Sequence, residues 1–249
     1  MLGSFLRSPR FKAFAIHLCG SLAIGLAMLW LVFGVWYPAP LHEAVGVTDI
    51  FVMLLAVDVV IGPLLTLVVY KVGKKTLVFD MAVILLLQVS ALAYGVWTVA
   101  EGRPAWLVFN ADRFDVVRAL DIDTRQLDAA APEYRRAPWF GPHWVGADNP
   151  EDPKQRQALM LEAAAGGSDI PQRPELYRSL ERVASAMRAK ALPLEKLASF
   201  NDPVRVQAEL KPWADADAWL PLMAGNQSMV VLINKGSARV VAVVNLLPW

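Results

Sequence analysis

Three long apolar runs dominate the first 100 residues of the chain. They cover residues 13–37, 50–70 and 81–100, and Asp58 is the one formally charged residue within them. An α-helix rises about 1.5 Å per residue, so about 20 apolar residues span the hydrocarbon core of a bilayer. A helix buried in a soluble core usually keeps a polar margin. The pattern therefore predicts three transmembrane helices.

The first run resembles a signal peptide only at its start. Arg7, Arg10 and Lys12 precede it, as in a secretory signal. The apolar stretch is too long, however, and it ends in Trp36-Tyr37-Pro38-Ala39-Pro40 instead of a small-x-small cleavage site. We therefore predict an uncleaved anchor, with Trp36 and Tyr37 in an interfacial aromatic belt.

The basic residues of this half predict the orientation of the helices. They lie before the first helix and in the loop 71–75, whereas the loop between the first two helices has no Lys or Arg. The positive-inside rule places residues 1–12 and the loop 71–75 in the cytoplasm. Three crossings then leave residues 101–249 outside, which is the periplasm in a bacterium with two membranes. We expect a multi-pass inner-membrane protein.

Strand signals frame the second half of the chain. Residues 103–118 indicate a buried strand that runs into a turn. The Val-rich runs 229–234 and 239–246 are joined through residues 235–237 and predict a hairpin, with Gly236 supplying a positive φ.

Helix signals lie between these strands. One helix is expected to start at Asp152-Pro153 and to end at Gly166-Gly167, and another to start at 201–203. Residues 175–190 carry apolar side chains on one helical face. We therefore predict a small α+β periplasmic domain over 101–249 with an antiparallel sheet, large enough to bury its own core.

The charge balance of this half excludes some partners and sites. It holds 18 of the 24 Lys and Arg residues and 19 of the 23 Asp and Glu residues. Basic residues are not in excess, so the charge does not indicate binding to nucleic acid. The single cysteine, Cys19, lies in the first apolar run. This excludes a disulfide framework and a cysteine-rich metal site.

Polar side chains inside the apolar runs are the first candidate site. Asp58 lies 12 residues from Tyr70 and Gln88 lies 12 residues from Thr76, and both reference residues adjoin the cytoplasmic loop, so we expect Asp58 and Gln88 at similar depth and hydrogen-bonded. The same argument pairs His17 with Asp80. These groups either hold the three helices together or, in the case of Asp58, face the transmembrane helix of a partner.

Gly62 and Pro63 follow Asp58 by one turn and add to this candidate site. Proline removes a backbone donor, so we expect a kink there that leaves carbonyl groups available to a neighbour.

The sequence contains no recognisable catalytic constellation. HExxH, GxSxG, Walker and dinucleotide-binding patterns are absent, and His42 and His143 have no ligand-spaced companions. The aspartates between Asp112 and Asp123 lack the glycine and the closing glutamate of a calcium loop, so we interpret them as surface carboxylates. We predict no catalytic, cofactor or metal site.

Three aromatic residues in a loop rich in Pro and Gly form a second candidate. Trp139, Phe140 and Trp144 lie within residues 138–144. They would form either a periplasmic binding surface or a plug that covers the core, and the sequence leaves both readings open.

Several segments together resemble the TfpX/TfpZ family of type IV pilin accessory proteins. The resemblance rests on residues 11–18, 35–41, 58–67 (Asp-Val-Val-Ile-Gly-Pro-Leu-Leu-Thr-Leu), 74–80, 102–115 and the final Pro248-Trp249. It covers nearly the whole chain, and residues 125–200 match least clearly.

The resemblance implies a non-enzymatic, chaperone-like inner-membrane protein that supports the stability, assembly or display of the major type IV pilin. A pilin before assembly has one helix in the bilayer and its head in the periplasm. We therefore expect the three helices to cradle the pilin helix and the exported domain to contact the head. The alternative is a membrane-anchored periplasmic sensor or ligand-binding protein, which the small cytoplasmic portion disfavours.

Overall fold

The computed structural model describes residues 8–150 and 152–249 and divides into two compact units. The first unit combines Met1–Val35 with Val47–Glu101, and the second combines Trp36–Gly46 with Gly102–Trp249. Of the basic residues that the orientation argument uses, Arg7 lies outside the described residues.

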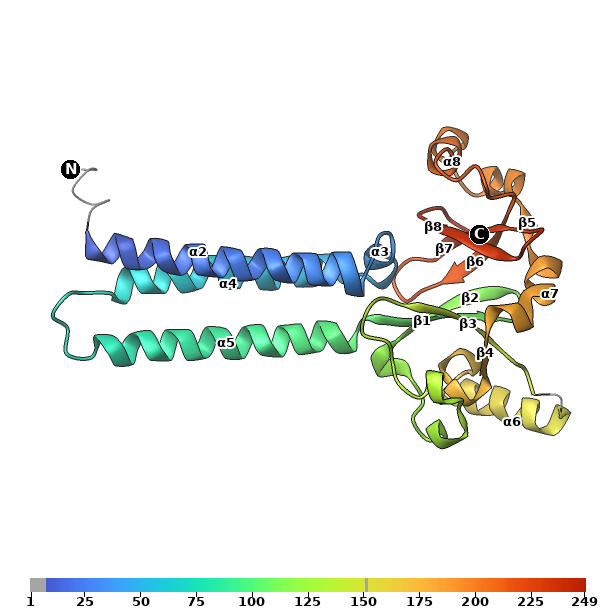
Figure 1. Cartoon of the computed structure of the whole chain (residues 1–249), viewed down its shortest axis with the longest axis horizontal. Helices are drawn as coiled ribbons and strands as arrows, with labels where there is room; N and C mark the ends of the chain where they lie inside the picture. The colour runs from blue at the N-terminus through green and yellow to red at the C-terminus, as the bar shows by residue number, and fades with distance from the viewer. Residues whose placement is uncertain (1–7, 151) are drawn as a thin grey trace. The chain divides into compact units, whose positions relative to one another are not determined.

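The first unit is built from long apolar helices (Figure 1). They are α2 (Pro9–Leu29), which continues as a π-helical segment (Trp30–Trp36), α4 (Thr48–Val69) and α5 (Leu77–Glu101). Each of the three is long and apolar enough to cross a membrane, as the sequence predicts. Ser8 caps α2 by accepting a hydrogen bond from the backbone N–H of Phe11, and Pro9 occupies the first turn.

Helix α4 packs against both of its neighbours, α2 and α5. At its C-terminal end, Arg10 donates from Nε to the carbonyl of Tyr70 over 2.8 Å and from a terminal nitrogen to the carbonyl of Val68 over 3.1 Å. A guanidinium there satisfies carbonyls that have no intrahelical donor. Because Arg10 lies in the first turn of α2, the start of α2 is fixed beside the end of α4.

The second unit is a curled mixed sheet. Its strands run in the order β4-β3-β1-β2-β6-β7-β8, and β5 pairs with β6. The strands are β1 (Pro104–Asn110), β2 (Arg113–Arg118), β3 (His143–Ala147), β4 (Tyr177–Arg178), β5 (Leu192–Pro193), β6 (Ala218–Met223), β7 (Met229–Asn234) and β8 (Arg239–Val244).

The expectation of an antiparallel sheet is wrong for two strand pairs. β1 pairs with β3 in parallel, and so does β2 with β6. The hairpins β1–β2 and β7–β8 are antiparallel. Parallel neighbours need long crossover connections. Here residues 111–142 connect β1 to β3, and residues 119–217 connect β2 to β6. Turn residues in the sequence predict hairpins, in which the paired strands are adjacent in the chain, but they do not predict pairing between distant strands.

The helices of this unit are α3 (Leu41–Val45), α6 (Pro153–Ala164), α7 (Leu180–Lys190) and α8 (Pro203–Leu210). Asp152 and Asp202 cap α6 and α8 as predicted, and Gly166 follows α6 with a φ of 87°. Helix α7 begins at Leu180, five residues later than the amphipathic pattern predicts. The preceding Tyr177 belongs instead to β4, where it is fully buried and donates from its hydroxyl to the carbonyl of Pro171.

The β7–β8 hairpin is present, but its turn differs from the prediction. Ala238 carries the positive φ, 56°, that was expected at Gly236. The side-chain oxygen of Asn234 accepts hydrogen bonds from the backbone N–H and the hydroxyl of Ser237. The Asn234 side chain thus stabilises the turn, and the residue with left-handed backbone is Ala238, after the bonded Ser237.

The core of the second unit includes the segment between α2 and α4. Leu41 and Ala44 of α3 pack in the same apolar cluster as Phe109, Leu220 and Val231 of the sheet. The backbone carbonyl of Ala44 also accepts hydrogen bonds from the N–H groups of residues 226 and 227. The segment is thus an integral part of this fold, although it is separated from the rest in sequence.

The aromatic residues at the start of this segment are buried. Trp36 is 6% exposed and Tyr37 is 1% exposed. Burial raises the pKa of Tyr37, against the opposing effect of the Arg118 and Arg103 guanidiniums. The Tyr37 ring therefore fills space within the fold and does not face outward toward lipid, as a side chain of an interfacial belt would.

Candidate functional site

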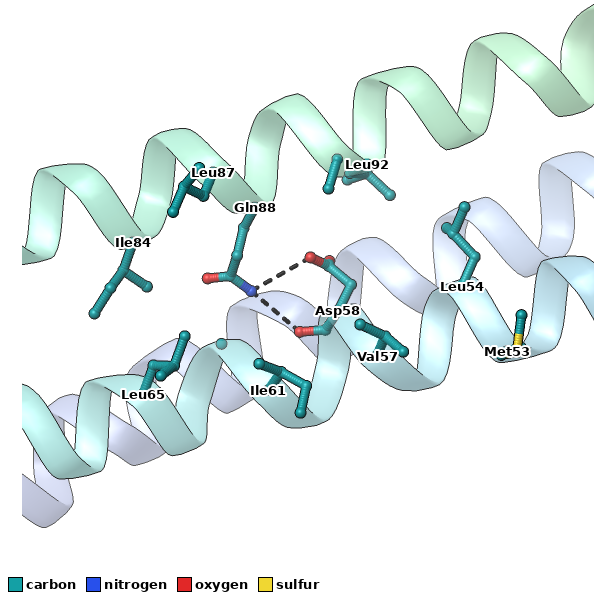
Figure 2. Close-up of a pocket in the computed structure, with 12 residues that line it drawn as sticks. Met53, Leu54, Val57, Asp58, Ile61, Leu65, Ile84, Leu87, Gln88 and Leu92 are labelled. Atoms are coloured by element: carbon teal, nitrogen blue, oxygen red, sulfur yellow. Dashed lines mark hydrogen bonds between the residues drawn. The ribbon is translucent and has the colours of Figure 1, made fainter.

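A polar pair bridges α4 and α5 in the middle of two apolar helices (Figure 2). Gln88 donates from Nε2 to the backbone carbonyl of Asp58 over 3.1 Å and to Asp58 Oδ1 over 3.3 Å. Both side chains are half-buried. The hydrogen bond expected from their similar depth is present, and it additionally involves the main chain of Asp58.

Gly62 makes the approach of Gln88 possible. A Cβ atom at residue 62 would lie 1.7 Å from Gln88 Nε2, so a larger residue cannot share this space with the amide. Pro63 is buried inside α4 and has no N–H to donate to the carbonyl of Val59. The two residues thus loosen one turn of α4 directly beside the polar pair.

The polar pair borders a cavity of about 430 Å³ between α4 and α5. The rest of its lining is apolar or glycine: Met53, Leu54, Val57, Ile61, Gly62, Leu65, Ile84, Leu87, Ala91 and Leu92. Gln88 Oε1 is buried and has no hydrogen-bond partner within residues 8–150 and 152–249. The cavity therefore combines an apolar wall with one unused acceptor, which is suited to an apolar helix or chain that offers a donor.

The outer surface of α5 is apolar and exposed next to this cavity. Leu85, Leu86, Leu87 and Val89 are between 55% and 66% exposed. Among the described residues, α5 packs chiefly on α4, so most of its circumference has no protein neighbour. A face of this kind fits contact with lipid or with another spanning helix.

His17 and Asp80 do not meet, so the predicted pairing is wrong. His17 Nδ1 lies 2.6 Å from Thr66 Oγ1 on α4. Asp80 forms an ion pair with Lys74 over 2.7 Å and accepts from Thr76. The prediction assumed that α2 and α5 are neighbours, whereas α4 is the helix that contacts α2.

Two of the three aromatic residues in the loop 138–144 lie at the surface, and the third packs on the core. Trp139 is 55% exposed and Phe140 is 87% exposed, as a surface would require. Trp144 is half-buried, and its ring packs edge-on against Phe114 with centroids 5.0 Å apart. Trp144 also borders a cleft of about 580 Å³ beside α7 and β8.

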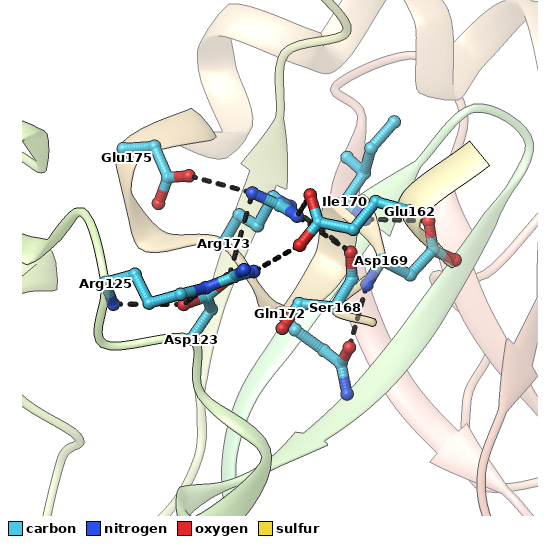
Figure 3. Close-up of polar contacts among 9 residues, drawn as sticks. All are labelled: Asp123, Arg125, Glu162, Ser168, Asp169, Ile170, Gln172, Arg173 and Glu175. Carbon is cyan, nitrogen blue, oxygen red and sulfur yellow. Dashed lines mark hydrogen bonds and ion pairs between the residues drawn. The ribbon is translucent and has the colours of Figure 1, made fainter. Parts of the chain in front are cut away.

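An ion-pair network that the sequence did not indicate lies around Arg173 (Figure 3). The Arg173 guanidinium is 3% exposed, lies 2.6 Å from Glu162 and 3.8 Å from Asp123, and donates to the carbonyl of Ser168. Arg125 binds Asp123 and Glu162 as well. Hydrogen bonds from Arg125 hold the pKa of Asp123 well below its usual range. The network ties α6 to the segment after β2, a structural role.

Two other aspartates of the 112–123 stretch, Asp115 and Asp121, also face arginines. Asp115 pairs with Arg113, and Asp121 binds Arg118 through both oxygens. Burial raises the pKa of Asp115 to about 6, although Arg113 opposes the shift. Within the described residues, no three His, Cys, Asp or Glu side chains are grouped so that they could hold a metal ion.

Comparisons with known proteins give a consistent result. A family model described as fimbrial assembly protein FimB matches residues 6–46. The chain is 31% identical over 233 residues to the fimbrial assembly protein of serogroup E1 of Dichelobacter nodosus, covering 90% of each chain. It is 33% identical over 185 residues to the serogroup I protein, covering 74% of this chain and 72% of the relative. No solved structure matches significantly.

Proposed function

The chain belongs to the fimbrial assembly protein family, and on that premise we propose that it is a non-enzymatic, chaperone-like inner-membrane protein that binds the major pilin of type IV fimbriae. The TfpX/TfpZ resemblance supports the same role. In this proposal α2, α4 and α5 cross the membrane, the N-terminus is cytoplasmic and the second unit is periplasmic. The position of Arg10 beside the end of α4 supports this topology, because it brings the basic N-terminus to the end of α4 that leads into the Lys71–Lys75 loop.

The Asp58–Gln88 pair beside its cavity is the observation that carries the proposal. A carboxyl group at mid-bilayer costs about 2.5–3.5 kcal/mol on insertion scales. A hydrogen bond between spanning helices recovers about 0.6 kcal/mol on average. The pair therefore costs more than it contributes to the packing of α4 on α5, which supports a role in binding.

The pilin helix is the occupant that we propose for this cavity. A spanning helix can place apolar side chains against the leucines of α5 while a hydroxyl or amide group binds to the Asp58–Gln88 pair. The chain then shields the pilin helix before assembly and releases it to the fimbria. Contact between the second unit and the pilin head is a further part of this proposal.

Two variants of Asp58 test the binding site. Asp58→Asn keeps a group that can bind Gln88, and Asp58→Leu removes it. We expect both proteins to insert at normal levels and to lose most co-purification of the pilin, because the proposal assigns pilin binding to the Asp58 carboxyl group, which neither variant keeps. Ser90→Leu is the matched control, because it exchanges an exposed polar side chain of α5 outside the cavity lining for an apolar one. Pilin capture by both Asp58 variants at the control level would refute this site.

A gene deletion tests the function as a whole. The deletion strain should display fewer surface fimbriae while its pilin is processed normally. A protein that senses a periplasmic ligand is the second candidate, and the cleft beside Trp144 is the observation that favours it. Normal fimbriae in the deletion strain would support the sensor and contradict the accessory role.

A further inference from the structure

We propose that the tip of the loop 138–142, formed by Trp139 and Phe140, inserts into the interfacial layer of the membrane and binds lipid. This inference rests on the membrane insertion of α2 and α5 in the proposed function, but it assigns a different partner to a different surface. It concerns the second unit alone and needs no pilin.

The loop presents its aromatic residues to the outside. Phe140 is 87% exposed and Trp139 is 55% exposed. Gly141 has a φ of 82°, a left-handed turn that a larger side chain would strain, and it follows Phe140 directly. Two adjacent large aromatic side chains at the tip of a loop are unfavourable in water, and such positions mark contact with a membrane or another protein.

Contacts within the unit attach this loop to both places where the chain leaves an apolar helix. The Trp139 ring lies 6.2 Å from the ring of Trp36, the last residue of the first apolar span. The Arg103 guanidinium lies 4.1 Å from the centre of the Trp139 ring. Arg103 also donates to the carbonyl of Pro138 over 3.1 Å, and it follows the last residue of α5 by two positions.

These two anchors determine how far the loop tip can lie from the bilayer. A span that ends at Trp36 places that residue at the boundary of the hydrocarbon core. The polar interface is about 5–7 Å thick on each side of that core. A ring centre 6.2 Å from Trp36 therefore lies within or beside this layer. Phe140 is the next residue and has no covering side chain.

The chemistry of the loop fits a lipid interface better than a protein surface. Tryptophan is enriched at the level of lipid headgroups because its ring is apolar and its N–H is polar. Arg136, three residues before Trp139, is exposed and supplies a positive charge for lipid phosphate groups. We infer that the loop fixes the second unit against the membrane surface.

Fluorescence quenching at three positions tests the inference in the full-length chain. Cys19 is replaced by serine, and a single cysteine is then introduced as Leu86→Cys, Phe140→Cys or Val204→Cys. All three positions are exposed, so a polarity-sensitive label fits at each of them. The labelled proteins are reconstituted without pilin into vesicles of phosphatidylethanolamine and phosphatidylglycerol.

The expected pattern separates the two proposals. The label at residue 86 should be quenched by nitroxides in the acyl chains, which reports insertion of α5. The label at residue 140 should be quenched by nitroxides at the headgroup and should be several-fold less sensitive to aqueous iodide than the label at residue 204. If residue 140 behaves like residue 204 while residue 86 is inserted, only the lipid contact is refuted. An iodide-accessible residue 86 would overturn both proposals, and protection of residue 140 only after addition of pilin would assign the loop to a protein partner.

Discussion

The position of a Cβ atom on Gly62 lies 1.7 Å from Gln88 Nε2, so the amide of Gln88 occupies the space that any side chain at residue 62 would need. This relationship explains why a long polar side chain on α5 reaches the main chain of Asp58 on α4. The candidate site therefore depends on a residue without a side chain as much as on its two polar residues.

Gly62→Ala should disrupt the site without removing either polar group. The added methyl group displaces the Gln88 amide and breaks its bonds to Asp58, and overpacking of this kind costs about 1–3 kcal/mol. We expect a lower Tm in detergent and reduced pilin capture. Gly20→Ala on α2 is the matched control, because a Cβ atom there meets no atom within 4 Å. Equal behaviour of the two alanine variants would contradict the proposed packing.

Leu41→Ala tests whether the segment between α2 and α4 belongs to the fold of the second unit. Leu41 is 3% exposed within the main apolar cluster, and a cavity of this size costs about 2–5 kcal/mol. We expect faster proteolysis of residues 102–249 in the full-length protein. The control is Leu247→Ala, since Leu247 is 43% exposed. If both variants resist protease like the wild type, the segment does not stabilise the unit.

Arg173→Met should destabilise the second unit far more than a change in a surface ion pair. It leaves the buried carboxylate of Asp123 with one fewer cation, and breaking a buried pair costs about 3–5 kcal/mol. Arg239→Met is the comparison, because Arg239 and Asp215 form an exposed pair, a class worth about 0–1 kcal/mol. Thermal unfolding of the two variants measures the difference, and a Tm shift of similar size in both would refute the structural role of the network.

The sequence predicts what is local in this protein. Runs of 20 apolar residues identify the three helices, and Asp-Pro pairs identify the starts of α6 and α8 because capping depends on adjacent residues alone. The Asp58–Gln88 contact was also predictable, since depth in a membrane follows from counting residues along antiparallel helices.

Contacts between distant segments were not predictable in this way. The inclusion of Leu41 in the core and the parallel pairing of β1 with β3 join residues far apart in the chain. The predicted contact between His17 and Asp80 was wrong for the same reason, because equal depth in the membrane does not determine which helices are neighbours. The Arg173 network joins residues 123–125, Glu162 and residues 168–173, and no spacing in the sequence indicates it.

Asp115 should make the stability of the second unit depend on pH. It lies in the middle of β2 opposite Val108, and its Oδ2 atom is buried without a partner in the described part of the chain. Burial raises its pKa from an ordinary value near 3.9 to about 6, so the folded state holds the proton more tightly than the unfolded state. Ionising this carboxyl therefore costs folding free energy as pH rises from about 4 to about 6, by about 2–3 kcal/mol in total.

Asp115→Asn removes that cost, so the Tm of the variant minus that of the wild type should rise between pH 4 and pH 6 and then stay constant. The difference is the informative quantity, because the other carboxyl groups titrate in both proteins and cancel. Asp121→Asn is the control, since both oxygens of Asp121 accept from Arg118 and replacing one of them by an amide nitrogen should produce no such gain. Thermal unfolding of the full-length proteins in detergent at a series of pH values provides the measurement. A difference between Asp115→Asn and the wild type that does not change with pH would show that Asp115 ionises in the folded protein as it does in the unfolded chain.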